Sequence, residues 1–241
     1  MVFIAKDPLQ FGSLLFATVI LVLVEFAACS TLIVPHEYPT IQQAIDSAIA
    51  GDSIEVQSGI YQEQVIINKS LKLSGMDTGG GIPAIISEYV DSIIKINADY
   101  VIVEGLQIMN TYDAATNAGI IVNGNNNILR DNVLNSKGYS GFRILNSHNN
   151  TILNNTVSNK DYGIYLDNGS LNTITSNNIS NNFIGIYIKL SSKNIGDNRI
   201  AHNKYGMVYD VPFLIESDIY NNIYHENGYN TARIGEIGLE P

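Results

Sequence analysis

Residues 161–182 read DYGIYLDNGSLNTITSNNISNN, and the next stretch, residues 183–203, reads FIGIYIKLSSKNIGDNRIAHN. Both stretches carry a glycine near the start, apolar residues one and three places after it, and an Ile-x-x-Asn-x-Ile phrase further on. Apolar residues that alternate with other residues are typical of a β-strand. A unit of about 22 residues that recurs with the same residue types indicates a repeat protein.

The glycine of this unit recurs along more than a third of the chain. Gly119, Gly141, Gly163, Gly185 and Gly206 are separated by 22, 22, 22 and 21 residues. If the units stack, the residues after each glycine form two columns that face the interior. We expect these columns to be Ile120, Phe142, Ile164, Ile186, Met207 and Val122, Ile144, Leu166, Ile188, Tyr209.

The second phrase of the unit predicts another pair of columns. Ile128, Ile152, Ile174 and Ile195 occupy its first position, and we expect them to face inward. Asn155, Asn177 and Asn198 stand three places after the last three of these isoleucines. Asparagine side chains at equivalent turns of stacked strands bond up and down the stack, so we expect an asparagine ladder there.

A unit of this length cannot bury its apolar face alone, and stacking removes the problem. The repeat therefore predicts an all-β fold, a right-handed parallel β-helix whose coils of about 22 residues lie about 4.8 Å apart. A leucine-rich repeat is the rival, because its period also spans 22 residues. The later copies put Asn or Asp where that repeat has leucine, which favours the β-helix.

Composition supports strands and turns and excludes several classes of function. The 241 residues include 36 Ile and 29 Asn but only 18 Leu, a balance that favours strands and turns over helices. The net charge of −10 disfavours nucleic acid as a partner, because phosphate binding needs clustered Lys and Arg. A single cysteine, Cys29, excludes an intrachain disulfide and a multi-cysteine metal centre.

The N-terminal segment, residues 1–29, predicts export. Residues 11–24 form an apolar run of signal-peptide length, followed by small residues. The sequence Phe26-Ala-Ala-Cys29 is similar to a lipobox, which makes Cys29 a candidate for lipidation; an uncleaved membrane anchor is the alternative. Either way we expect the bulk of the chain outside the cytoplasm, secreted or anchored to the envelope, with membrane contact only through this segment.

The rest of the chain divides into three predicted parts. Residues 31–80 form an N-terminal cap and the first coils, residues 81–226 the repeats, and residues 227–241 a C-terminal cap or tail. A short capping helix is expected within Pro39–Ala50, since Thr40 and Gln43 form a capping-box pattern and apolar residues share one helical face. Solenoids need such caps to cover the core at their ends.

The opening of the chain resembles that of NosD-like proteins, which carry parallel β-helix repeats. The resemblance rests on VPHEYPTIQQAI at residues 34–45, GDSI at 51–54, GIY at 59–61 and VIINKSL at 65–71, and it extends over roughly residues 32–225. It implies a β-helix on a cell surface, within a group that includes carbohydrate-binding and sugar-cleaving proteins and surface-layer components. Pectin methylesterases share a Thr-Ile-Gln-x-Ala-Ile phrase, here at residues 40–45, and a Gly-x-Tyr-x-Glu-x-Val phrase, here at residues 59–65 and including Glu63. Their catalytic phrases have no match in this sequence.

Outward positions of the repeat supply the candidate site. Two and four places after the glycines stand the six residues that we predict to bind a sugar: Arg143, Tyr165, Asp167, Tyr187, Lys189 and Asp210. A tyrosine ring stacks on a pyranose face, and polar groups bond its hydroxyls, while Arg143 suits a uronate carboxylate. The alternative is that these residues only stabilise the sheet as cross-strand pairs.

The sequence thus predicts a carbohydrate-binding or structural surface module, whose partners are cell-surface polysaccharide or envelope and surface-layer proteins. A polysaccharide lyase or hydrolase is the alternative, with Lys189 or Arg143 as base and calcium held by Asp167 and Asp210. No catalytic residue and no resident cofactor is assigned. Copper is not expected, because His148 and His202 fall at different points of the repeat and Met207 faces inward. Asn154 and Asn168 are glycosylation candidates in sequons at predicted turns.

Overall fold

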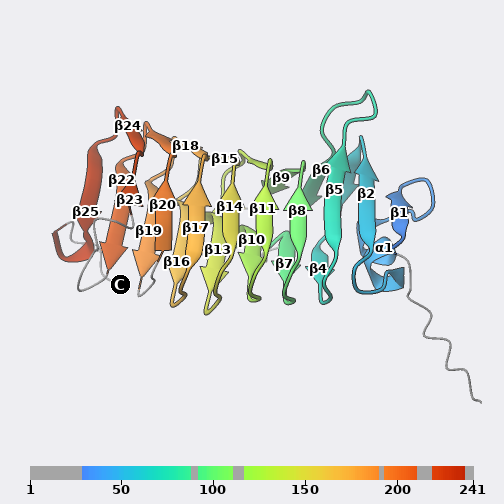
Figure 1. Cartoon of the computed structure of the whole chain (residues 1–241). Coiled ribbons are helices and arrows are strands. Elements are labelled where there is room, and N and C mark those ends of the chain that lie inside the picture. Colours follow the sequence, from blue (N-terminus) through green and yellow to red (C-terminus); the bar gives the residue numbers. More distant parts are fainter. Residues whose placement is uncertain (1–28, 88–91, 111–116, 190–192, 211–218, 237–241) are drawn as a thin grey trace, which may run out of the picture.

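The computed structural model describes residues 29–87, 92–110, 117–189, 193–210 and 219–236, and the chain winds through them as one stack of coils (Figure 1). Each coil contributes one strand to each of three parallel sheets. The predicted N-terminal segment lies outside the described residues except for Cys29, which is exposed. Among the described residues no helix is long and apolar enough to span a bilayer.

The three sheets are named A, B and C in chain order. Sheet A contains nine strands: β1 (Thr31–Val34), β2 (Ser53–Gln57), β5 (Lys72–Met76), β8 (Ile102–Glu104), β11 (Ile128–Arg130), β14 (Thr151–Leu153), β17 (Asn172–Thr175), β20 (Lys193–Gly196) and β23 (Ile219–Tyr220). Sheet B contains eight strands: β3 (Ile60–Gln62), β6 (Ala84–Ser87), β9 (Gln107–Asn110), β12 (Val133–Leu134), β15 (Thr156–Ser158), β18 (Asn178–Ser180), β21 (Arg199–Ala201) and β24 (Ile223–His225). Sheet C contains eight strands: β4 (Val65–Ile67), β7 (Ile94–Ile96), β10 (Ala118–Val122), β13 (Ser140–Leu145), β16 (Tyr162–Asp167), β19 (Ile184–Lys189), β22 (Tyr205–Asp210) and β25 (Tyr229–Arg233). The predicted parallel β-helix is confirmed.

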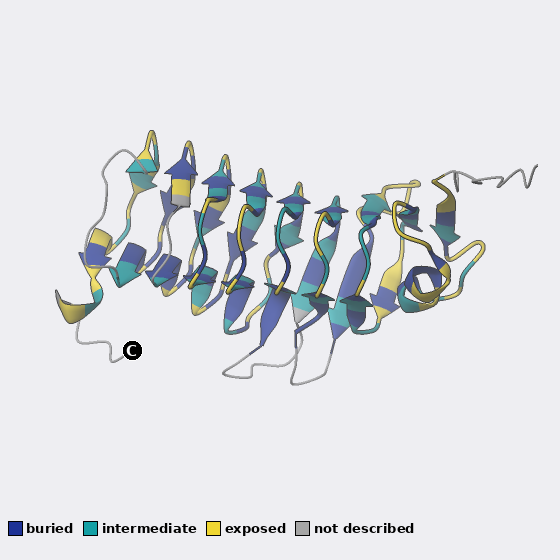
Figure 2. Ribbon diagram, turned by 60° about the horizontal axis from the view of Figure 1, so that its bottom comes forward, coloured by how far each residue is buried: buried dark blue, intermediate teal, exposed yellow. Residues whose placement is uncertain are grey.

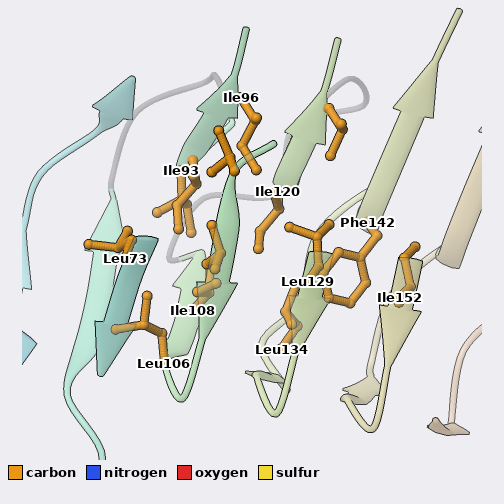
Figure 3. Close-up of a cluster of buried hydrophobic side chains, with 14 of the residues drawn as sticks. Leu73, Ile93, Ile96, Leu106, Ile108, Ile120, Leu129, Leu134, Phe142 and Ile152 are labelled. Atoms are coloured by element: carbon orange, nitrogen blue, oxygen red, sulfur yellow. The ribbon is translucent and has the colours of Figure 1, made fainter. Parts of the chain in front are cut away.

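The two glycine-linked columns face the interior, as predicted. In sheet C the register pairs Ile120 with Phe142, and Phe142 with Ile164, in successive coils. All three side chains are fully buried, and Figure 3 shows Ile120 and Phe142 within the interior cluster. Figure 2 shows the same division in the central coils, where the strands are largely buried and the turns between them are exposed.

One member of the inward column predicted for the first position of the second phrase is wrong. Ile152, Ile174 and Ile195 are buried, but Leu129 rather than Ile128 pairs with Ile152 and fills the interior. Ile128 pairs with Thr151 and is only half-buried. The coil that contains Leu129 is 23 residues long, and a shift of one residue moves a side chain to the opposite face of a strand.

The asparagine ladder at Asn155, Asn177 and Asn198 is confirmed, and it is longer than predicted. Asn132 precedes these residues and Asn222 follows them, each bonded to its neighbour by the same two contacts. Two further asparagine ladders lie at the other two turns of the coil. One contains Asn127, Asn150 and Asn172, and the other contains Asn182, Asn203 and Asn227. These buried amides bond the backbone groups that the tight turns leave unpaired.

The capping helix is α1 (Ile41–Ser47), which is shorter than the predicted range. Thr40 caps it, and the Glu63 carboxylate also accepts from the backbone N–H groups of Ile41 and Gln42 at 2.9 Å each. The Gln42 side chain bonds both the N–H and the C=O of Ile66, the open edge of the first coil. The phrases shared with pectin methylesterases therefore build the cap in this chain.

The predicted C-terminal cap or tail includes one more strand of sheet C. Strand β25 pairs with β22, and Asn227 ends the third asparagine ladder. We expect removal of residues 227–241 to increase aggregation, because it uncovers the apolar edge of β22, and exposed edges pair with other chains. Static light scattering of the truncated protein should rise above that of the intact protein, and equal scattering would contradict the prediction.

Candidate functional site

The outer face of sheet C carries the predicted site residues, and their columns have the predicted register. Arg143 lies beside Tyr165, and Tyr165 beside Tyr187, in three successive coils. The same outward column begins earlier, with Lys95 paired to Ile121, and Ile121 to Arg143. Lys95 was not among the predicted site residues, because the earlier coils lack the glycine that marks the register.

The second column places opposite charges in alternation. Asp167 pairs with Lys189, and Lys189 with Asp210. The Lys189 ammonium lies 3.7 Å from an Asp167 carboxylate oxygen. The two aspartates are thus separated by the lysine coil, about 9.6 Å for two strand spacings. They do not converge on one point, as two ligands of a calcium ion would have to.

Four tyrosines and one arginine form a contiguous cluster on this face. The rings of Tyr165 and Tyr187 stack with centroids 5.0 Å apart, and the Tyr162 ring meets each of them edge-on at 5.4 Å. Tyr139 lies 5.0 Å from Tyr162. The Arg143 guanidinium carbon stands 5.3 Å from the Tyr165 ring centre and 5.8 Å from that of Tyr139. Tyr139 was missed at the sequence level, since it sits in the turn before its strand.

Burial divides the face into two halves. Tyr187 is only 4% exposed, and Val208, next in the column, is fully buried. They belong to a second apolar cluster with Ile184, Tyr205 and Ala232, against which Ile234 packs from the short 3-10 helix η2 (Ile234–Glu236). Tyr187 therefore lacks an open ring face for a sugar. Tyr139, Arg143, Tyr162 and Tyr165 are half-buried and remain accessible.

The hydroxyls of Tyr162, Tyr165 and Tyr187 have raised pKa values and are neutral at physiological pH. Burial raises the pKa of Tyr162 to about 12, and burial likewise raises the pKa of Tyr187. Burial and the nearby Asp167 carboxylate raise the pKa of Tyr165. A catalytic base works best with a pKa near the operating pH, so these phenols act as hydrogen-bonding groups instead. Lys189, the base considered for a lyase, is held by Asp167.

The two glycosylation candidates lie at exposed turns, as predicted. Asn154 and Asn168 both adopt left-handed backbone angles, with φ of 54°. Their side-chain amides donate to Asp131 at 2.6 Å and to Asn146 at 2.7 Å. Glycan attachment at these nitrogens stays a prediction, as does lipidation of Cys29.

The fold brings together a set of metal-ligating groups that the sequence did not suggest. Ligand atoms of His202, His225 and Glu226 all lie within 4.8 Å of one another. His148 lies at another turn, where it bonds Ser170 at 2.6 Å. The separation of His148 from His202 was predicted, but the proximity of His225 to His202 was not. Their spacing of 23 residues, about one coil, is the signal in the sequence that could have identified this proximity.

Solved structures are similar to this chain at low sequence identity. The ORF18 protein of Geobacillus virus E2 superposes with a TM-score of 0.50 at 15% identity, over 76% of this chain and 43% of that one. A pectin methylesterase from Aspergillus niger gives 0.49 at 15% identity, over 87% of this chain and 86% of that one. The similarity to the viral protein bears on the fold alone. No protein of curated function matches the sequence significantly.

A family model described as "Periplasmic copper-binding protein (NosD)" matches residues 45–236, which is most of the chain. A periplasmic family agrees with the predicted extracytoplasmic location. Among the described residues, the donor set that fits copper is the group of His202, His225 and Glu226, because imidazole nitrogen and carboxylate oxygen suit Cu(II). The match covers most of the chain and coincides with the repeated coils, so this chain belongs to the NosD family.

Proposed function

We propose that this protein is an extracytoplasmic β-helix that binds an acidic polysaccharide on the outer face of sheet C, from β7 to β16. The observation that carries the proposal is the position of the Arg143 guanidinium beside the rings of both Tyr139 and Tyr165. A tyrosine face takes the apolar face of a sugar ring. A guanidinium beside it binds a uronate carboxylate through two parallel hydrogen bonds.

The spacing of the coils suits an extended chain. Strands of neighbouring coils lie about 4.8 Å apart, close to the length of one sugar unit in an extended polymer. Lys95 and Arg143 stand two coils apart in one column, with Ile121 between them. A polymer that crosses the coils would place alternate units against cations and the intervening unit against an apolar side chain. This pattern favours a uronate polymer over a neutral one.

The same face offers little for bond cleavage. The aspartates that would hold a cation are separated by Lys189, and that lysine is paired with Asp167. Tyr162 and Tyr165 keep their protons, because burial raises their pKa values. We therefore expect binding without turnover.

A pull-down with insoluble polysaccharides tests the proposal. The purified protein would be mixed with uronate and neutral polymers, with and without calcium, and the supernatants assayed for released oligosaccharides. We expect retention on the uronate polymer alone, independent of calcium, and no products. Released products would replace the proposal with a lyase or hydrolase, and failure to bind any polymer would leave a structural surface module.

Two matched pairs of variants locate the binding face. Arg143→Ala should weaken uronate binding by about tenfold or more, since a hydrogen bond to a charged group contributes about 1.5–3 kcal/mol. Tyr165→Ala should weaken it by a smaller factor, about two- to tenfold. Arg199→Ala and Tyr100→Asn change exposed residues away from this face and should bind like the parent. Asn suits position 100 because its φ is 58°. Equal losses in both pairs would contradict the assignment.

A further inference from the structure

Three ligating side chains meet on the surface where two coils turn from sheet B to sheet C. His202 follows β21, while His225 ends β24 and Glu226 follows it. Because β21 and β24 are parallel and Ala201 pairs with His225, His202 and Glu226 occupy the same position in adjacent coils. The three residues thus come from two coils and approach one another only in the folded chain.

The turn position itself is unusual in these two coils. In the two preceding coils it is filled by Asn159 and Asn181, with φ of 62° and 57°. His202 and Glu226 adopt the same left-handed backbone, with φ of 57° and 50°. Asparagine is the residue that tolerates this conformation best after glycine. At the last two coils the chain therefore replaces a favourable turn residue with an imidazole and a carboxylate.

The two distances between an imidazole nitrogen and the Glu226 carboxylate match those between ligands of one cation. His202 Nδ1 lies 3.1 Å from Glu226 Oε2, and His225 Nε2 lies 3.4 Å from Glu226 Oε1. Ligands with metal bonds of about 2.0–2.2 Å stand about 3.0–3.5 Å apart around one ion. The two imidazole rings are nearly perpendicular, with centroids 5.5 Å apart, so their nitrogens reach the carboxylate from different directions.

The donor types select the class of cation. Two imidazole nitrogens and a carboxylate suit Cu(II) and Zn(II), whereas calcium takes oxygen ligands and Cu(I) prefers thiolate or thioether sulfur. Three protein ligands leave further positions for water or an exchanging partner. All three side chains are exposed, between 41% and 64%, so an ion can enter without rearrangement of the coils.

We propose that His202, His225 and Glu226 form a surface site for a divalent transition metal, which binds Cu(II) more tightly than Zn(II). That order follows the general preference of nitrogen and oxygen sites for first-row metals. The site lies on the turns between sheets B and C, and the sugar-binding proposal concerns other residues, so either can fail without the other. A His–Glu ion pair without metal affinity is the competing explanation of the same contacts.

Metal titration of the untagged full chain tests the site. After removal of metals by a chelator, Cu(II), Zn(II) and Ca(II) would each be titrated by calorimetry, with glycine as a competitor for copper. We expect one equivalent of Cu(II) and of Zn(II) and no calcium binding. The bound Cu(II) should show imidazole nitrogen couplings in its electron paramagnetic resonance spectrum. Absence of stoichiometric Cu(II) and Zn(II) binding would overturn the proposal.

Variants assign the ligands. His202→Asn restores the turn residue of the two preceding coils, so it removes a ligand and keeps the backbone favourable. His202→Asn, His225→Gln and Glu226→Gln should each weaken binding at least tenfold, the scale on which even indirect partners of a metal site act. His148→Gln, at another exposed turn, and Cys29→Ser should leave the affinity unchanged. Unchanged binding in His202→Asn together with His225→Gln, or an equal loss in His148→Gln, would overturn the assignment.

Discussion

Asn177→Ala is expected to lower the free energy of unfolding by about 3–5 kcal/mol. The Asn177 side-chain oxygen accepts from the backbone N–H of Asn155 at 2.8 Å, and its amide donates to the carbonyl oxygen of Ile152 at 2.9 Å and to Asn198 at 3.0 Å. Alanine leaves this N–H and this carbonyl oxygen buried without their partners, and each such loss costs about 1–3 kcal/mol. Urea denaturation followed by circular dichroism measures the change.

The adjacent residue provides the control for this prediction. Asn178 is exposed at the start of β18, and its one side-chain hydrogen bond among the described residues, from Arg199, is long at 3.4 Å. Asn178→Ala should therefore change stability by about 0.5 kcal/mol or less. Solenoids can unfold in parts, so the two variants would be compared by their denaturation midpoints as well as by extrapolated free energies. Equal midpoints for the two variants would show that the ladder contributes little.

Gly163→Ala is expected to destabilise the coils by about 3 kcal/mol, at the upper end of the usual cost of overpacking. A Cβ atom at position 163 would lie 2.5 Å from the carbonyl oxygen of Gly185 and 2.9 Å from the Ile179 side chain. The first of these is backbone of the next coil, which cannot move aside without breaking the stack. This close approach explains why the repeat keeps glycine at this position. Thermal unfolding by calorimetry would register the loss.

A second glycine separates this steric effect from the general effect of adding a methyl group. A Cβ at Gly235 would meet no heavy atom within 4 Å, and its backbone does not require glycine. Gly235→Ala should therefore leave the melting temperature close to that of the parent. A large loss at Gly235, or none at Gly163, would contradict the close-packing explanation.

The candidate binding face was only partly predictable from the sequence. The outward positions of Arg143, Tyr165 and Lys189 follow from the alternation of the strand after each glycine. The burial of Tyr187 does not follow, because the cluster that contains it includes Ala232 and is packed against by Ile234, both from a segment without the repeat. The place of Lys95 in the outward column was also not predicted, because its coil lacks the glycine that fixes the register.

The sequence by itself determined the period of the coils, the buried columns and the asparagine ladder, because stacking places equal positions of successive units against each other. Only the tertiary structure decided which coils are longer or shorter than the average. The coil that begins near residue 128, for example, has one extra residue, so that Leu129 rather than Ile128 faces the interior. The tertiary structure also placed Glu226 in the same position as His202 of the preceding coil, where an even 22-residue period would have placed Tyr224. The physical reason is that contact between coils depends on the exact length of each turn, whereas the repeat reports only the average length.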